Sequence, residues 1–169
     1  MSGAPVRVVA PAKLTVELKV VGARPDGMHL IDAEMVSLDL HDIVVIDPAG
    51  RPGEVSASGA FAGAGPLGAS NLAARALALV GRRASLHLVK HIPAGAGLGG
   101  GSADAAAVLR WAGAGDLDAA SRLGADVPFC LVGGRARVGG IGEVVAALPY
   151  VERTVTLLTP TVRCSTPAV

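Results

Sequence analysis

The alternation of apolar and polar positions near the N-terminus predicts the first strand. Over residues 12–20, leucine and valine occupy one set of alternate positions, and lysine, threonine and glutamate occupy the other. Successive side chains of a strand point to opposite faces, so this segment predicts a half-buried strand. The sequence Arg24-Pro25-Asp26-Gly27 has turn chemistry and connects the strand to a second segment that runs through His29.

The rest of the chain mixes short strands with helices. Apolar runs predict strands at residues 43–46, around Val55, and at residues 86–90, 136–138 and 155–158. Helices are predicted from a cap at Ser70 through Leu79 to a stop at Gly81, over residues 105–111, and from a cap at Asp116 through Leu123. Residues 125–129 are predicted to turn into a further β region. We find no internal repeat and no linker.

Composition narrows the class of protein. The chain has 169 residues, of which 51% are hydrophobic and 17% charged, so it favours one folded domain over a disordered chain. Aromatic residues make up 2% and the net charge is +1, which excludes a basic or base-stacking surface for nucleic acid. The longest uncharged stretch, residues 55–74, is rich in glycine and polar residues, which argues against a membrane span. Without an N-terminal export signal, a cytoplasmic location is expected.

The cysteines and histidines do not suggest a metal site. Cys130 and Cys164 lack metal-binding spacing and are predicted to be small buried thiols. The gap between His87 and His91 would separate them by roughly 13 Å in a strand, which is too far for one ion. His41 is also expected to be a surface or strand residue.

A glycine-rich segment between a predicted strand and a predicted helix carries the clearest chemistry. It reads Pro93-Ala94-Gly95-Ala96-Gly97-Leu98-Gly99-Gly100-Gly101-Ser102-Ala103-Asp104. Glycines let backbone N–H groups approach a ligand closely, and the N-terminus of the following helix adds partial positive charge, so the segment predicts a phosphate-binding loop. Ser102 is expected to cap the helix, Asp104 to lie in its first turn, and Gly113 to end it.

Two familiar phosphate loops fit this segment poorly. The ending Gly-Lys-Ser/Thr of a Walker A loop is missing. Gly95, Gly97 and Gly100 match the dinucleotide fingerprint, but that fold requires a second strand ending in an acid about 20 residues on. The nearby acids, Asp116 and Asp118, instead begin a predicted helix. A dinucleotide-dependent oxidoreductase remains an alternative, and it would bind NAD in preference to ATP.

Four blocks together resemble the GHMP small-molecule kinases. They are Ala10-Pro11-Ala12-Lys13-Leu14, Arg24-Pro25-Asp26-Gly27-Met28-His29, the loop at residues 93–103, and Leu123-Gly124-Ala125-Asp126-Val127-Pro128-Phe129. The resemblance implies an α+β fold, the ribosomal protein S5 domain 2-like N-terminal domain of these kinases. It also implies transfer of the γ-phosphoryl group of ATP, with Mg²⁺ on the nucleotide. The acceptor implied by the three blocks besides the loop is a methylerythritol hydroxyl of a cytidyl-diphosphate substrate.

The same resemblance implies roles for individual residues. Asp126 would be the general base, with Lys13 beside it. Residues Pro93, Ala94, Gly95, Ala96, Gly97, Leu98, Gly99, Gly100, Gly101, Ser102 and Ala103 would hold the nucleotide. The substrate side would include Thr15, Met28, His29 and Thr166. Taken singly, Lys13 also fits a solvated strand lysine, and Asp126 a turn carboxylate that caps backbone N–H groups.

The chain departs from the family pattern in two respects. Met28 stands where the family has a tyrosine that stacks on cytosine, Met35 replaces a nearby aromatic residue, and Thr15 replaces an asparagine. Family members also carry a C-terminal domain that should begin near Val169, so we expect residues 1–169 to form the N-terminal domain, with residues 160–169 leading toward a missing one. Self-association, instability or a covering partner is then expected. A non-catalytic nucleotide-binding module and a kinase for another small alcohol remain alternatives.

Overall fold

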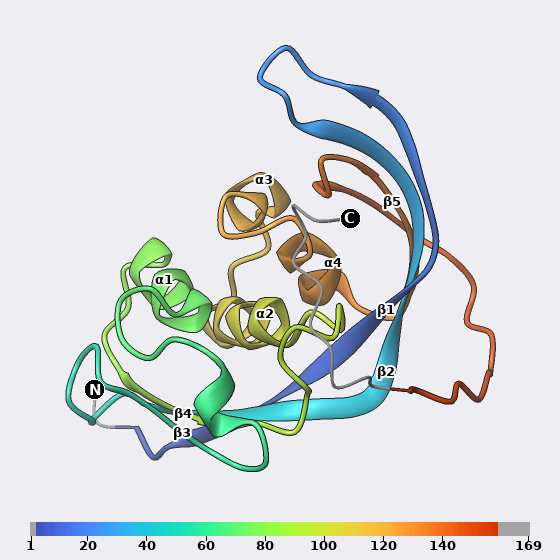
Figure 1. Cartoon of the computed structure of the whole chain (residues 1–169). Helices are drawn as coiled ribbons and strands as arrows, with labels where there is room; N and C mark the ends of the chain where they lie inside the picture. Colours follow the sequence, from blue (N-terminus) through green and yellow to red (C-terminus); the bar gives the residue numbers. More distant parts are fainter. Residues whose placement is uncertain (1–2, 159–169) are drawn as a thin grey trace.

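A computed structural model describes residues 3–158, apart from the side chain of Ala64. These residues form a curved six-stranded sheet whose concave side holds the helices (Figure 1). The strand order is β3-β4-β2-β5-β6, and β1 pairs with β2. The strands are β1 (Val6–Ala23), β2 (His29–Asp47), β3 (Val55–Ser58), β4 (Ser85–Val89), β5 (Arg135–Gly140) and β6 (Val144–Ala147). The helices are the 3-10 turn η1 (Ala62–Ala64) and α1 (Leu72–Leu79), α2 (Gly100–Ala112), α3 (Leu117–Ser121) and α4 (Val127–Val132).

A long antiparallel hairpin of β1 and β2 supports the domain. The predicted turn is confirmed: the Arg24 N–H donates to the Met28 carbonyl at 2.8 Å, and Gly27 adopts a φ of +82°. The second strand is much longer than the predicted segment 43–46, because β2 pairs with β1 along most of its length. It also pairs with β4 at one end and with β5 at the other. Pairing with β1, β4 and β5 stabilises β2, although its polar residues interrupt the alternation of apolar and polar positions that would predict a strand.

A bulge in β1 overturns the prediction that one face of residues 12–20 is buried. Thr15 lies opposite Met35 while Glu17 lies opposite Glu34, so Val16 is an extra residue in the ladder. The bulge moves later side chains to the other face. Val16, Leu18 and Val20 are 46%, 58% and 61% exposed. Alternation predicted the strand correctly, but it did not predict what covers the strand.

Two helix starts differ from the prediction. Asn71 caps α1 in place of Ser70, since its side chain accepts from the Ala73 N–H. Gly99, in the left-handed region, precedes α2, and Ser102 lies inside that helix without capping it. The end of α2 at Gly113 and the cap of α3 at Asp116 are confirmed, although α3 ends before Leu123.

The C-terminal third was predicted least well. Residues 127–132 form helix α4, where a β region was predicted, and Val127 and Phe129 are fully buried. Pro128 suits the first turn of a helix because its missing N–H is unneeded there. A strand forms at β6, whereas residues 155–158 carry no strand.

In the described part of the chain, no helix is long and apolar enough to cross a membrane.

Candidate functional site

The glycine-rich loop lies between β4 and α2, as predicted. Gly95, Gly97 and Gly99 have φ values of +74°, +72° and +68°, which side chains rarely adopt. Residues 94–97 are exposed. Immediately behind the loop, α2 runs for 13 residues, so its unpaired N–H groups and its dipole face the loop. The geometry can therefore hold an anionic group such as a phosphate.

Strand β1 anchors the loop. The Lys13 N–H donates to the Leu98 carbonyl at 3.0 Å, and the Leu98 side chain is buried. A Cβ on Gly99 would lie 2.8 Å from Cγ of Lys13. Glycine is needed at this position because the lysine side chain crosses directly over the start of α2.

Lys13 and Asp126 meet beside the loop. The Lys13 Nζ lies 3.3 Å from Oδ2 of Asp126 and donates to Oγ1 of Thr15 at 3.1 Å. Lys13 is 8% exposed, so it is not the solvated strand lysine considered above. Asp126 directly precedes α4, yet its side chain caps no backbone N–H. With 31% of its side chain exposed, the Asp126 carboxylate is accessible to a ligand.

A cavity of about 430 Å³ opens next to the loop. Its walls come from β3, β4, the segment before α1, and the loop itself. Apolar lining residues include Ala57, Phe61, Leu67, Leu72, Leu88 and Ile92. Polar groups of Asn71, Lys90, Ser102 and Asp104 also line it. An apolar cavity with a few polar groups is typical of a small-ligand site.

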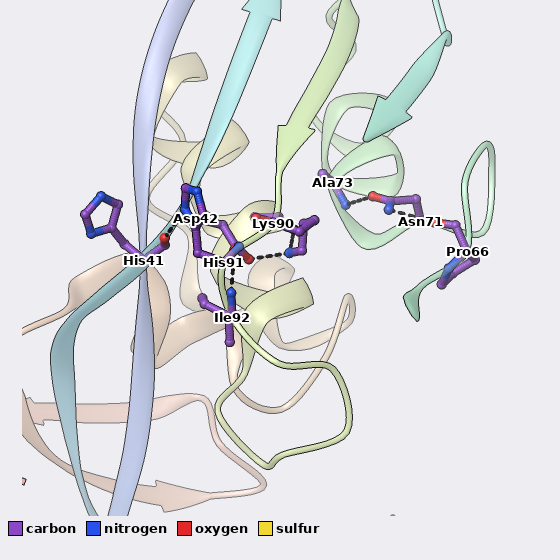
Figure 2. Close-up of polar contacts among 9 residues, drawn as sticks. His41, Asp42, Pro66, Asn71, Ala73, Lys90, His91 and Ile92 are labelled. Carbon is purple, nitrogen blue, oxygen red and sulfur yellow. Dashed lines mark hydrogen bonds and ion pairs between the residues drawn. The ribbon is translucent and has the colours of Figure 1, made fainter. Parts of the chain in front are cut away.

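Asn71 shapes the wall of this cavity. Its Oδ1 accepts from the Ala73 N–H at 2.9 Å and its Nδ2 donates to the Pro66 carbonyl at 2.9 Å (Figure 2). One side chain therefore caps α1 and fixes the loop before it.

A buried charged cluster is formed by Asp42, Lys90 and Asp104, and the last two of these residues line the cavity. The Lys90 ammonium contacts Oδ2 of both carboxylates. Asp42 also accepts from the Ile92 N–H at 2.9 Å, which ties β2 to the start of the loop (Figure 2). Oδ1 of Asp104 is buried without a hydrogen-bond partner among the described residues. Burial raises the pKa of Asp104 to about 7, although the Lys90 charge acts in the opposite direction.

This cluster was not predicted from the sequence. Asp104 was expected in the first turn of α2, but the residue lies in the second turn and is 2% exposed. A single acid within the otherwise apolar run of residues 103–109 is the signal that could have revealed it, because carboxylates are rarely buried without a partner.

The predicted substrate residues are only partly brought together. Thr15 contacts Lys13, but Met28 and His29 lie at the exposed tip of the β1–β2 hairpin, away from the loop (Figure 1). Met35 is in the core at 4% exposure, so it does not present its sulfur to a ligand. Thr166 and Cys164 lie outside the described residues. Cys130 is buried as predicted, and burial raises its pKa to about 12.

Comparisons with known proteins identify similar sequences and structures. A family model described as the GHMP kinases N terminal domain matches residues 67–134, which include the glycine loop and Asp126. A protein of Paracoccus denitrificans (strain Pd 1222), named 4-diphosphocytidyl-2-C-methyl-D-erythritol kinase, is 48% identical over 168 residues. The chain is thus similar to the GHMP kinases, and its residues 67–134 match their N-terminal domain. A protein of the same name from Dinoroseobacter shibae (strain DSM 16493 / NCIMB 14021 / DFL 12) is 44% identical over 173 residues.

The matches cover 96% and 98% of this chain and 59% of each relative, so the chain spans less than two thirds of their length. The crystal structure of a 4-(cytidine 5'-diphospho)-2C-methyl-D-erythritol kinase is 36% identical with a TM-score of 0.62, over 85% of this chain and 55% of that one. Homoserine kinase from Cytophaga hutchinsonii shares the fold at 22% identity and a TM-score of 0.57, over 87% and 52% of the two chains. The predicted α+β fold of the GHMP kinase N-terminal domain is thus confirmed.

Proposed function

We propose that this chain binds ATP at the glycine loop and catalyses phosphoryl transfer to an alcohol. The acceptor we propose is the methylerythritol hydroxyl of 4-diphosphocytidyl-2-C-methyl-D-erythritol, in isoprenoid precursor biosynthesis. The observation that carries the proposal is the ion pair of Lys13 and Asp126, 3.3 Å long, beside a glycine loop that begins a helix. The names of the relatives support the choice of acceptor.

In the proposed reaction, the substrate hydroxyl gives its proton to the Asp126 carboxylate as its oxygen attacks the γ-phosphorus. The new oxygen–phosphorus bond forms while the bond to the β-phosphate oxygen breaks, and ADP leaves. Lys13 orients the carboxylate and offsets negative charge on the reacting oxygens. The loop amides and the N-terminus of α2 hold the phosphates, and the neighbouring cavity accommodates the nucleoside.

Magnesium would enter with the nucleotide. Within residues 3–158, no group of three or more His, Cys, Asp or Glu side chains could hold a metal ion. Mg²⁺ in kinases is commonly held by phosphate oxygens together with one or two carboxylates, so the site is compatible with Mg²⁺–ATP. The ion would shield the phosphate charges, and the roles of Lys13 and Asp126 do not depend on its position.

The test compares Asp126→Asn with Asp118→Asn, an exposed α3 residue that serves as control. Phosphorylation of the cytidyl substrate and binding of a non-hydrolysable ATP analogue are measured for each variant, with NAD as a binding control. We expect Asp126→Asn to reduce turnover about 10²- to 10⁴-fold and leave analogue affinity unchanged. Full turnover in this variant would remove Asp126 from the mechanism. Saturable analogue binding without turnover by the unaltered chain would favour a nucleotide-binding module.

A further inference from the structure

The turn between β5 and β6 lies against the loop that carries Asp126. We call residues 140–143 the β5–β6 turn. The Gly142 N–H donates to the Gly139 carbonyl at 3.1 Å, and the Ile141 N–H donates to Oε2 of Glu143 at 2.6 Å. Most turns are exposed, but Gly142 is buried. The backbone of residue 125 explains this burial.

Gly142 approaches Ala125 more closely than any residue with a side chain could. A Cβ at Gly142 would lie 3.0 Å from the Ala125 carbonyl carbon and 3.2 Å from its Cα, and nearer still to its oxygen. These are backbone atoms, so the conflict could not be relieved by a rotamer change. The φ of Gly142 is +120°, which also favours glycine.

The position of Ala125 in turn sets that of Asp126. The Asp126 side chain makes no capping bond, so its orientation depends on its backbone and on the ion pair with Lys13. On the other side, Val127 and Phe129 are fully buried, and the Val127 N–H donates to the Gly124 carbonyl at 3.0 Å. The segment at residues 124–126 is therefore held between the buried side chains of α4 and the β5–β6 turn.

We infer that Gly142 is a positioning residue for the reaction, and that it acts by holding the Asp126 carboxylate in register with Lys13. This inference rests on the proposed function. A side chain at Gly142 would displace the Ala125 backbone and move the carboxylate relative to the substrate hydroxyl. Displacements of about 1 Å at a reacting group can reduce rates about 100-fold. The glycine loop is separate from this contact, so nucleotide binding should be retained.

The test is Gly142→Ala with Gly134→Ala as the matched control. Gly134 has a φ of +75°, and a Cβ added there would meet nothing within 4 Å, so alanine at this position adds backbone strain without a clash. We expect Gly142→Ala to lower kcat about 10- to 100-fold relative to Gly134→Ala, with the KM for ATP unchanged. Equal kcat values in the two folded variants would overturn the inference.

A double-mutant cycle separates positioning from a general structural role. In the Asp126→Asn background, Gly142→Ala should cause no further loss of kcat, because the group it positions is already removed. An undiminished further loss would contradict action through Asp126. If Asp126→Asn itself retained turnover, the catalytic role of Asp126 would fail and this inference with it, whereas the proposed function fails if the unaltered chain binds the ATP analogue without turnover. If Asp126→Asn lost turnover while Gly142→Ala kept it, only the present inference would fail.

Two further measurements keep the inference testable when Gly142→Ala does not fold or the chain shows no turnover. Glu143→Ala removes the side-chain bond to the Ile141 N–H and keeps Gly142, so it should lower kcat several-fold at constant KM for ATP. Unchanged kcat in that variant would overturn the inference. Without turnover, the nuclear Overhauser contact between the Lys13 and Asp126 side chains serves as the readout. It should weaken in Glu143→Ala and persist in Gly134→Ala, and an unweakened contact would refute the inference.

Discussion

Replacement of Asp104 by asparagine tests the buried charged cluster through the pH dependence of stability. The Asp104 side chain is 3% exposed and contacts Lys90, while its Oδ1 has no partner among the described residues. Burial raises its pKa from 3.8 to about 7. Between these values, the folded state binds more protons than the unfolded state, so the free energy of unfolding decreases as the pH rises.

The magnitude follows from the size of that pKa shift. A shift of about 3 units corresponds to about 4 kcal/mol over the whole window, and about 2 to 3 kcal/mol of this falls between pH 5 and pH 8. Urea unfolding of the unaltered chain and of Asp104→Asn at both pH values measures the difference between them. Asparagine does not titrate, so the variant should gain about 2 to 3 kcal/mol relative to the unaltered chain as the pH rises.

Because both proteins carry the same other titratable groups, the difference in unfolding free energy between Asp104→Asn and the unaltered chain isolates the titration of Asp104. A difference between the proteins that stays constant within about 0.5 kcal/mol from pH 5 to pH 8 would refute the reasoning. It would mean that Asp104 stays ionised in the folded state, with Lys90 offsetting the cost of its burial.

Two further substitutions test the local structure of the site and its core. Asn71→Ala removes the cap of α1 and the bond to Pro66, and should lower the free energy of unfolding by about 1 kcal/mol in urea titrations. Asn71→Ser should retain most of the stability, and equal losses in the two variants would argue against a capping role. Phe129→Ala empties a fully buried position in α4, the helix that follows Asp126, and should lower the free energy of unfolding by about 3 to 5 kcal/mol in the same measurement. A loss below about 1 kcal/mol would show that the core there collapses around the smaller residue.

Several features of the fold and of the candidate site were predicted correctly from the sequence. The Gly-rich segment, flanked by an apolar run and a helical pattern, predicted a loop between β4 and α2, which the structure confirms. The turn at residues 24–27 and the helix end at Gly113 were also predicted correctly. In each case the determining interactions lie within a few residues, so local backbone preferences decide the conformation.

The proximity of Lys13 and Asp126 was expected solely from the family resemblance. No periodicity or spacing joins two residues so far apart in the chain, whereas the structure places their side chains 3.3 Å apart. The wrong β prediction at residues 125–129 has a similar origin. That short apolar run fits either a strand or a helix, and the structure packs it as α4 against α2 and α3.

The sequence by itself determined the glycine-rich loop, the strand and helix that flank it, and the family that these motifs resemble. Tertiary structure alone decided the bulge at Val16, the burial of Asp104 against Lys90, and the contact of Gly142 with the loop before Asp126. Each of these depends on pairing or packing between distant segments. Local sequence encodes backbone preference, but the environment of a side chain is set by whichever segments fold against it.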